Sequence, residues 1–261
     1  MSTETLSLGP EATRLEREPS SRARGRVLVV VPAFNESARL RNVLQAIHRQ
    51  IESTADILVV DDGSGDATSE EALRAGALAA RHPFNLGCGA ALQTGYKFAL
   101  ERGYDFIVQI DADGQHDPSC LASVLAPVQE GKADIAIGSR FLWTGGYRSP
   151  IERRVGSWLF GQVATLFIGT RITDPTSGYR AMNRKALALC ASDSFPHDYP
   201  DADVLINLHR AGVVITEVPA LMHPRQGGHS MHRGLRPLYY MFKMSLSIFV
   251  ALLRERPSPS V

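Results

Sequence analysis

The chain has 261 residues, 44% of them hydrophobic, and its 28 Lys and Arg balance 27 Asp and Glu to a formal net charge of +1. This length is enough for one large α/β domain, and the balanced charge gives no reason to propose a nucleic-acid partner held by phosphate electrostatics. The three cysteines, Cys88, Cys120 and Cys190, lie far apart without Cys-X-X-Cys spacing. This pattern argues against a disulfide scaffold or a zinc site and fits a reducing, cytoplasmic compartment.

The N-terminal segment is rich in charged residues and poor in large apolar ones. It therefore reads neither as a secretory signal nor as a buried element. Residues 1–24 are predicted to form a disordered tail.

Strand–loop–helix units follow the tail. An apolar, β-branched run at residues 27–31 precedes a loop at residues 32–36 and a helical pattern that extends to Ile51. The other elements predicted for this half of the chain are strands at residues 57–61, 77–80, 106–110 and 134–137 and helices at residues 67–75, 88–102 and 118–129. Continuous apolar strands between helices are typical of a doubly wound, mostly parallel sheet with helices on both faces.

Three polar loops, at residues 32–36, 61–66 and 111–115, each follow a predicted strand. In open sheets of this kind, ligands bind beyond the carboxyl ends of the strands. We therefore expect the three loops to share one site, although each loop alone could also be a turn or a helix cap.

The third loop reads Asp-Ala-Asp-Gly-Gln at residues 111–115. Side chains two apart in a strand point the same way, so Asp111 and Asp113 are expected to present two carboxylates to one side of the sheet edge. A hard cation such as Mg²⁺ or Mn²⁺ takes one or two protein carboxylates and fills its remaining positions with phosphates and water. The pattern favours a metal-and-diphosphate site, although Asp and Gly are also common where strands end in turns.

Five motifs occur in order along the chain: Val-Pro-Ala-Phe-Asn-Glu at residues 31–36, Val-Asp-Asp-Gly-Ser at 60–64, Asn-Leu-Gly at 85–87, Asp-Ala-Asp-Gly-Gln-His-Asp-Pro at 111–118 and Gly-Ser-Arg-Phe at 138–141. This combination resembles family 2 glycosyltransferases, and most closely the branch of polyprenyl-phosphate (dolichyl-phosphate) mannose or glucose synthases. The resemblance spans about residues 26–232. It implies a GT-A fold, which is Rossmann-like, in a catalytic domain at residues 25–232, a nucleotide-diphosphate sugar as donor, and Mg²⁺ or Mn²⁺ as cofactor.

On the donor side, the resemblance implies a base-binding wall made of Pro32, Phe34 and Glu36. Asp61 would accept a hydrogen bond from the base, and Asp62 would lie near the ribose or the metal. Gly63 would let the backbone turn tightly, as in an ordinary strand-to-helix turn. Asn85 and Gly87 would bring backbone amides close to a phosphate or sugar, with tight helix-on-sheet packing as the alternative.

Three side chains resemble the metal ligands of the family: Asp111, Asp113 and Gln115. The cation would bridge both phosphates of the donor and lower the barrier to breaking the anomeric C–O bond, which makes Asp113 a catalytic residue as well. Arg140 resembles a catalytic arginine whose planar fork binds the donor diphosphate or an acceptor phosphate. A surface ion pair is the alternative for Arg140.

On the acceptor side, residues 174–180 match a loop of the family in which Asp174 and Arg180 could brace one another. Asp203, expected early in a helix that runs to about Arg210, matches a catalytic position that faces the acceptor. It would act as the base toward a hydroxyl, or orient a lipid phosphate, whose attacking oxygen is already anionic. Acids in a first helical turn are also favoured by the helix dipole, so stability alone could explain Asp203.

After a strand predicted at residues 213–218, residues 224–233 resemble the Arg-X-X-Gly-X-Ser closing loop of the family. Arg225 and Ser230 would contact phosphate there once both substrates are bound. Met231 stands where the mannose branch usually has Lys. This departure leaves the donor and the acceptor open.

Residues 233–261 are expected to form a C-terminal part, with an apolar helix at residues 237–253 and a short tail. The apolar stretch is interrupted by Lys243 and is shorter than the ~20 residues that a transmembrane helix needs. Tyr239 and Tyr240 suit an amphipathic, interfacial helix at the cytoplasmic face of a membrane, where a lipid-linked acceptor would lie. The alternative is a helix packed on the catalytic domain, in a homodimer or against a membrane-protein partner.

The resemblance therefore implies a metal-dependent, inverting glycosyltransferase that uses a polyprenyl phosphate acceptor in the synthesis of cell-envelope glycans or glycoconjugates. One alternative is transfer to a sugar hydroxyl of a polysaccharide, with Asp203 as base. Another is a non-catalytic partner in a glycan assembly complex, which would be expected to have lost an acid, whereas the chain keeps Asp61, Asp111, Asp113 and Asp203. A nucleotidyltransferase typically opens with a Gly-rich loop and a basic residue, which residues 31–36 lack.

Overall fold

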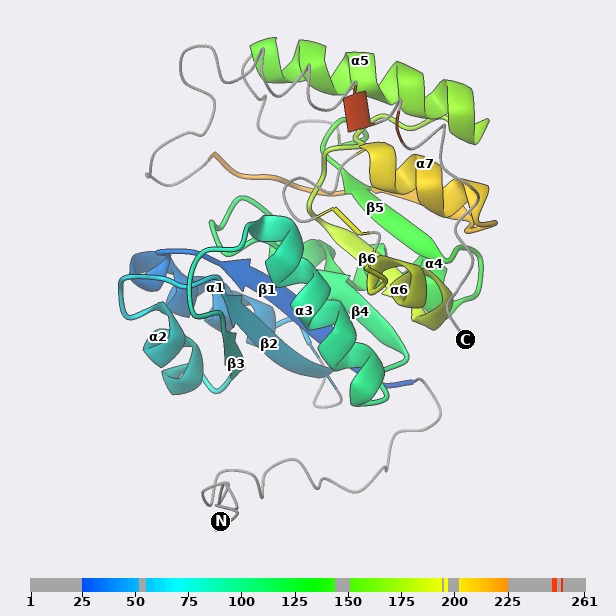
Figure 1. Ribbon diagram of the computed structural model, residues 1–261. Coiled ribbons are helices and arrows are strands. Elements are labelled where there is room, and N and C mark those ends of the chain that lie inside the picture. Colours follow the sequence, from blue (N-terminus) through cyan, green and yellow to red (C-terminus); the bar gives the residue numbers. More distant parts are fainter. Residues whose placement is uncertain are drawn as a thin grey trace.

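The computed structural model describes residues 25–51, 55–143, 151–193, 195–196 and 202–224, together with residues 246, 247 and 250. In this part of the chain a seven-stranded sheet has the order β3-β2-β1-β4-β6-β5-β7, with helices packed against it (Figure 1). Three predicted features lie outside the described residues: the tail 1–24, most of the apolar helix 237–253, and the closing loop with Arg225 and Ser230.

The elements of the N-terminal half follow the predicted order. The strands and helices of the whole described chain are β1 (Val27–Ala33), α1 (Ser37–His48), β2 (Ala55–Asp61), α2 (Thr68–Arg74), β3 (Leu78–Arg81), α3 (Cys88–Glu101), β4 (Phe106–Gln109), the 3₁₀ turn η2 (Pro118–Cys120), α4 (Leu121–Gln129), β5 (Ile135–Ser139), α5 (Ile151–Ile168), β6 (Arg180–Asn183), α6 (Arg184–Cys190), α7 (Ala202–Arg210) and β7 (Ile215–Pro219).

The sheet is mostly parallel, as predicted. Strand β1 pairs in parallel with β2 and β4, β2 with β3, and β5 with β7. Strand β6 is antiparallel to both of its neighbours, β4 and β5. Strand β6 is not predicted from the sequence, because Arg180–Asn183 contains no apolar run and its first residue belongs to the loop expected at residues 174–180.

Apolar side chains cover both faces of the sheet, which confirms the doubly wound layout. Along β1, Val29 and Val31 belong to one core cluster, whereas Leu28 and Val30 belong to the other. The second of these clusters includes Leu92 of α3, Leu187 of α6 and Leu205 of α7, and the first includes Leu40 of α1, Ala72 of α2 and Val124 of α4. Helix α5, which was not predicted, packs on the outer side of α7 (Figure 1).

The parallel pairing brings the carboxyl ends of β1, β2 and β3 to one edge. In the register, Ala33 lies beside Asp61, and Asp61 lies beside Arg81. Strand β4 runs parallel to β1 and ends beside Val30, so the loop after it opens at the same edge. This edge therefore carries the loops at residues 34–36, 62–67, 82–87 and 110–117.

Candidate functional site

The loops that follow β1 and β2 are hydrogen-bonded to each other. The Asn35 N–H donates to Ser64 Oγ at 2.9 Å, and the Gly65 N–H donates to Asn35 Oδ1 at 2.9 Å. Asn35 has a φ of 55°, a left-handed conformation that Asn adopts more readily than most residues. The two loops therefore form one unit, in which the Phe34 side chain remains 46% exposed.

Three residues predicted to bind the base are buried: Pro32, Glu36 and Asp61. Asp61 accepts a hydrogen bond from the Ser64 N–H at 2.9 Å through Oδ1 and one from the Ser69 hydroxyl through Oδ2. The carboxylate thus stabilises the turn after β2 through Oδ1 and the start of α2 through Oδ2. The exposed Phe34 is the member of the predicted wall that solvent reaches.

Asp62 is also buried, and it holds the loop between β3 and α3. Its Oδ1 accepts from the Leu86 N–H and its Oδ2 from the Gly87 N–H, both at 2.9 Å. Gly63, at φ +73°, lies against the same loop, since a Cβ there would come within 2.4 Å of the Phe84 carbonyl carbon. The Asp-Asp-Gly sequence therefore orders the loop that contains Asn85, whose side chain is exposed.

The acidic loop lies beyond β4. Residues 112 and 113 form a turn, and none of residues 111–114 continues the strand, so the alternation argument for the two acids does not apply. The Gln115 N–H donates to Asp113 Oδ1 at 3.0 Å, and the Asp111 N–H donates to His116 Nδ1 at 3.2 Å. All three predicted metal ligands are partly exposed, unlike the buried aspartates of the second loop.

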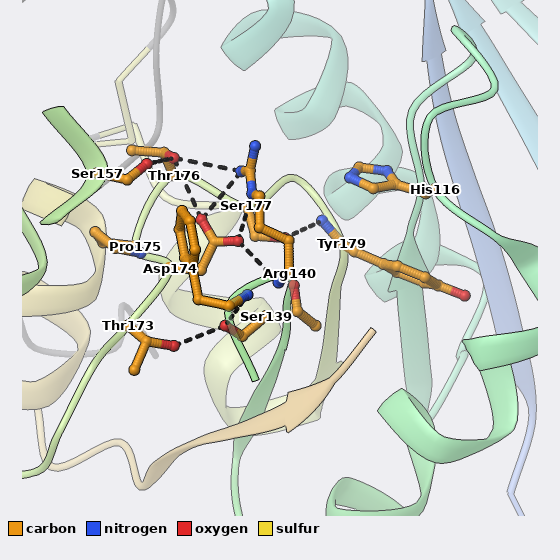
Figure 2. A network of polar contacts seen from close by, with 12 residues as sticks. His116, Ser139, Arg140, Ser157, Thr173, Asp174, Pro175, Thr176, Ser177 and Tyr179 are labelled. Atoms are coloured by element: carbon orange, nitrogen blue, oxygen red, sulfur yellow. Dashed lines mark hydrogen bonds and ion pairs between the residues drawn. The ribbon is translucent and has the colours of Figure 1, made fainter. Parts of the chain in front are cut away.

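His116 and Gly178 both lie directly against Asp111. Because His116 Nδ1 accepts the Asp111 N–H, that nitrogen carries no proton, and its 3.6 Å separation from Asp111 Oδ2 is a contact and not an ion pair. The His116 ring lies beside that of Tyr179, with centroids 5.1 Å apart (Figure 2). A Cβ on Gly178 would lie 2.8 Å from both carboxylate oxygens of Asp111. The sequence predicts no role for His116 or Gly178, because the contacts of His116 with Tyr179 and of Gly178 with Asp111 depend on two distant loops meeting.

The segment after β7 is bonded to the far side of the acidic loop. The Asp117 N–H donates to Leu221 O at 3.2 Å, and the His223 N–H donates to Gln115 O at 2.7 Å. Burial acts to raise the pKa of Asp117, but hydrogen bonds from Ser119 and His223 outweigh it and hold that pKa below its usual value. This segment therefore connects the acidic loop directly to the predicted closing loop.

The fit of a divalent cation can be judged from the oxygen atoms of this loop. Among the residues that the structure describes, no three His, Cys, Asp or Glu side chains form a metal-binding group by themselves. A cation that completes its shell with phosphate and water does not need such a group. Asp111, whose side chain is 38% exposed, and Asp113 offer carboxylates, and Gln115 offers an amide oxygen. These oxygen ligands fit Mg²⁺ or Mn²⁺ bound together with a diphosphate.

Arg140 forms a buried, bidentate ion pair with Asp174 (Figure 2). Its Nε donates to Asp174 Oδ2 at 2.6 Å and its Nη2 donates to Oδ1 at 3.0 Å, with side-chain exposures of 8% and 0%. The Asp174 N–H in turn donates to Glu217 at 2.8 Å, and burial raises the pKa of Glu217. Arg180 donates to backbone carbonyls instead of bracing Asp174. Arg140 therefore forms an ion pair, as the alternative expected, but the pair is buried and does not lie at the surface. The contact of Arg140 with a phosphate stays a prediction.

Asp203 lies in the first turn of α7 and is 5% exposed. Its Oδ2 accepts a hydrogen bond from Ser247 Oγ at 2.5 Å, while its buried Oδ1 has no hydrogen-bond partner within the described part of the chain. Ser247 belongs to the apolar C-terminal stretch, so at least this residue contacts the catalytic domain. The contact favours the packing alternative for that part of the stretch.

Comparison with known proteins identifies one family. The family model of glycosyl transferase family 2 matches residues 28–189. The chain is 35% identical over 218 residues to the undecaprenyl-phosphate mannosyltransferase of Micrococcus luteus, which covers 80% of this chain and 88% of that one. It is 35% identical over 233 residues to the polyprenol monophosphomannose synthase of Mycolicibacterium smegmatis, with 84% and 86% covered.

Solved structures share the fold at lower identity. Glucosyl-3-phosphoglycerate synthase from Mycobacterium tuberculosis, in complex with phosphoglyceric acid, has a TM-score of 0.66 and 23% identity over 88% of this chain and 79% of that one. The same enzyme with Mn²⁺ and uridine-diphosphate-glucose has a TM-score of 0.62 and 22% identity, with 87% and 78% covered.

Proposed function

The chain belongs to glycosyl transferase family 2, and from this membership we propose that it transfers a sugar, with inversion, from a nucleotide-diphosphate sugar to a polyprenyl phosphate in a metal-dependent reaction. The observation that carries the proposal is the pair of partly exposed carboxylates, Asp111 and Asp113, at the edge where three interlocked loops meet. Glycosyl transfer itself is the activity of the family.

Each part of the edge has a separate role in donor binding. Phe34 would contact the base, and the segment at residues 85–87, whose Leu86 and Gly87 N–H groups are already bonded to Asp62, would approach the diphosphate. Asp111 and Asp113 would hold Mg²⁺ or Mn²⁺, with Gln115 as a third ligand. When bound, this cation supplies positive charge that neutralises the leaving nucleoside diphosphate. A solved neighbour of the same fold contains Mn²⁺ and uridine-diphosphate-glucose, which supports a divalent cation at this edge.

The names of two relatives support a lipid phosphate acceptor, since one is an undecaprenyl-phosphate mannosyltransferase and the other a polyprenol monophosphomannose synthase. A phosphate oxygen is already anionic, so attack on the anomeric carbon needs no proton removal. Asp203 would then orient the acceptor side and would not act as base. Its Oδ2 is held by Ser247, and its Oδ1, which has no hydrogen-bond partner among the described residues, supports that role.

Helix α5 supports peripheral association with a membrane. Its outer side carries Trp158, Leu159 and Leu166, which are 62%, 40% and 77% exposed. Tryptophan and large aliphatic side chains on one side of a helix suit the headgroup region of a bilayer. No helix within the described residues has the length and apolarity required for a membrane span. We propose contact at the membrane surface, on the cytoplasmic face, where the lipid-linked acceptor would be reached.

The test is a transfer assay in which the sugar label is counted in both the organic and the aqueous phase. The protein is incubated with polyprenyl phosphate in vesicles, Mn²⁺ or Mg²⁺, and labelled UDP-, GDP- and dTDP-sugars in turn. We expect label in the organic phase with one donor, its loss in EDTA, and its loss in the Asp113→Asn variant. Label confined to a water-soluble glycan would instead support a sugar hydroxyl acceptor with Asp203 as base. Donor binding without any transfer would support the non-catalytic alternative.

A further inference from the structure

His82, which directly follows β3, is a buried histidine to which neither the sequence motifs nor the proposed reaction assigns a role. Its Nδ1 lies 2.8 Å from Asp62 Oδ1, and its Nε2 lies 2.9 Å from Thr94 Oγ1 of α3. A carboxylate only accepts hydrogen bonds, so Nδ1 must carry the proton and donate to Asp62. His82 thus connects the second loop of the site to α3.

The carboxylate of Asp62 has two further bonds, and both determine the shape of the loop between β3 and α3. It accepts from the N–H groups of Leu86 and Gly87, each at 2.9 Å. Gly87 has a φ of +101° and directly precedes the first residue of α3. With His82 in place, both oxygens of Asp62 are directed at these two amides. Without His82, the carboxylate would keep its two amide bonds but lose the third bond that holds it in this orientation.

We propose that His82 is a positioning residue for the donor. Through Asp62 it sets the backbone of residues 85–87, which is the segment proposed above to approach the donor diphosphate. This inference rests on the proposed function, because the loop matters only if a donor binds there. A preformed loop spares the donor the free-energy cost of ordering it, so His82 should affect donor affinity more than the rate of transfer once the donor is bound.

Two substitutions separate the effect of the His82 hydrogen bond from the effect of the volume of its ring. His82→Asn keeps an N–H near the position of Nδ1, whereas His82→Leu keeps bulk without a donor. Thr94→Val removes the contact at Nε2, together with the bond that the Thr94 hydroxyl donates to Ala90 O within α3. The matched control is His48→Leu, at an exposed histidine on α1.

The dissociation constants of UDP and GDP with Mn²⁺ are measured by calorimetry, and the KM and kcat of the donor by the transfer assay. His82→Leu is expected to weaken nucleotide binding and raise the donor KM about tenfold, the effect of one lost hydrogen bond, with kcat changed less. His82→Asn should restore most of the affinity, and Thr94→Val and His48→Leu should bind like the wild type. Equal affinity of the His82→Leu variant and the wild type, or equal weakness of the Leu and Asn variants, would overturn the proposal.

A second measurement needs no donor. Amide hydrogen exchange in peptides covering Leu86 and Gly87 should accelerate in the His82→Leu variant and return toward the wild-type rate in the Asn variant. Unchanged exchange would overturn the positioning role even if donor affinity fell. If exchange accelerates in the His82→Leu variant but the wild type binds neither UDP nor GDP, the proposed function is rejected. The donor role of His82 is then rejected with it.

Discussion

At the scale of single residues, burial divides the acids of the site into two groups. Asp61 and Asp62 are 0% and 3% exposed, and their oxygens accept hydrogen bonds from the loops around them. A buried carboxylate whose hydrogen bonds are all internal orders the backbone and has little capacity left for a ligand. Asp111 and Asp113 are partly exposed in the loop after β4. This distribution favours a role for Asp61 and Asp62 in shaping the loops and leaves metal binding to the acidic loop.

Gly178 leaves room for the Asp111 carboxylate because it has no side chain. We expect Gly178→Ala to weaken Mn²⁺-dependent nucleotide binding by tenfold or more, because the added Cβ would lie 2.8 Å from both oxygens of Asp111 and would push that carboxylate out of place. Calorimetric titration of UDP and GDP, with and without Mn²⁺, measures the effect.

The control for this substitution is Gly156→Ala in α5, where an added Cβ meets no atom within 4 Å. This variant should bind the nucleotides like the wild type. If Gly178→Ala also binds them like the wild type, the Asp111 carboxylate can move without loss, and its position would not be critical for the metal.

At the scale of elements, the sequence predicts most reliably the units whose own residues determine their form. The runs at β1 and β2 are β-branched and buried on both faces, so both strands were located to within a few residues. Strand β6 has four residues, begins with Arg180 and pairs antiparallel with two strands distant in sequence. Its strand character comes from those partners. Contacts such as that of His82 with Asp62 likewise depend on where loops meet, which no local pattern records.

Ser247 is expected to stabilise the start of α7. We expect Ser247→Ala to lower the free energy of unfolding by about 1–3 kcal/mol, because it removes the hydrogen bond to Asp203 Oδ2 and leaves a buried carboxylate whose other oxygen already lacks a partner in the described chain. Urea denaturation measures the change. Ser247→Thr, which keeps the hydroxyl, should restore most of it.

Ser123→Ala provides the comparison, since the Ser123 hydroxyl only donates within its own turn, to Cys120 O, on an exposed part of α4. Its effect should be smaller. If the urea midpoint of unfolding is the same in Ser247→Ala as in the wild type, the contact between residue 247 and α7 contributes nothing to stability. The C-terminal stretch would then be free to serve as the predicted interfacial helix.

At the scale of the whole molecule, the proposed site depends on both halves of the sheet. The parallel strands β1 to β4 provide the donor loops, while β6 follows the loop that places Gly178 against Asp111. The segment after β7 is bonded to the acidic loop, as the pairing of His116 with Met222 and the Asp117 N–H bond to Leu221 show. A change on the acceptor side can therefore reach the metal ligands through direct contacts.

The outer side of α5 is the proposed membrane contact. Leu159 and Leu166 are seven residues apart, so they lie on the same side of the helix, and both are exposed. We expect the double variant Leu159→Glu, Leu166→Glu to sediment with anionic phosphatidylglycerol vesicles at least tenfold less well than the wild type, because each buried leucine contributes about 1.5–3 kcal/mol that a glutamate would forfeit. Leu73→Glu, at a 58% exposed leucine of α2, is the matched control and should sediment normally. The double variant and Leu73→Glu should both bind nucleotides like the wild type, because the donor edge lies on other elements. If the α5 variant still sediments like the wild type, the membrane contact must lie elsewhere, and the C-terminal stretch becomes the surface to test.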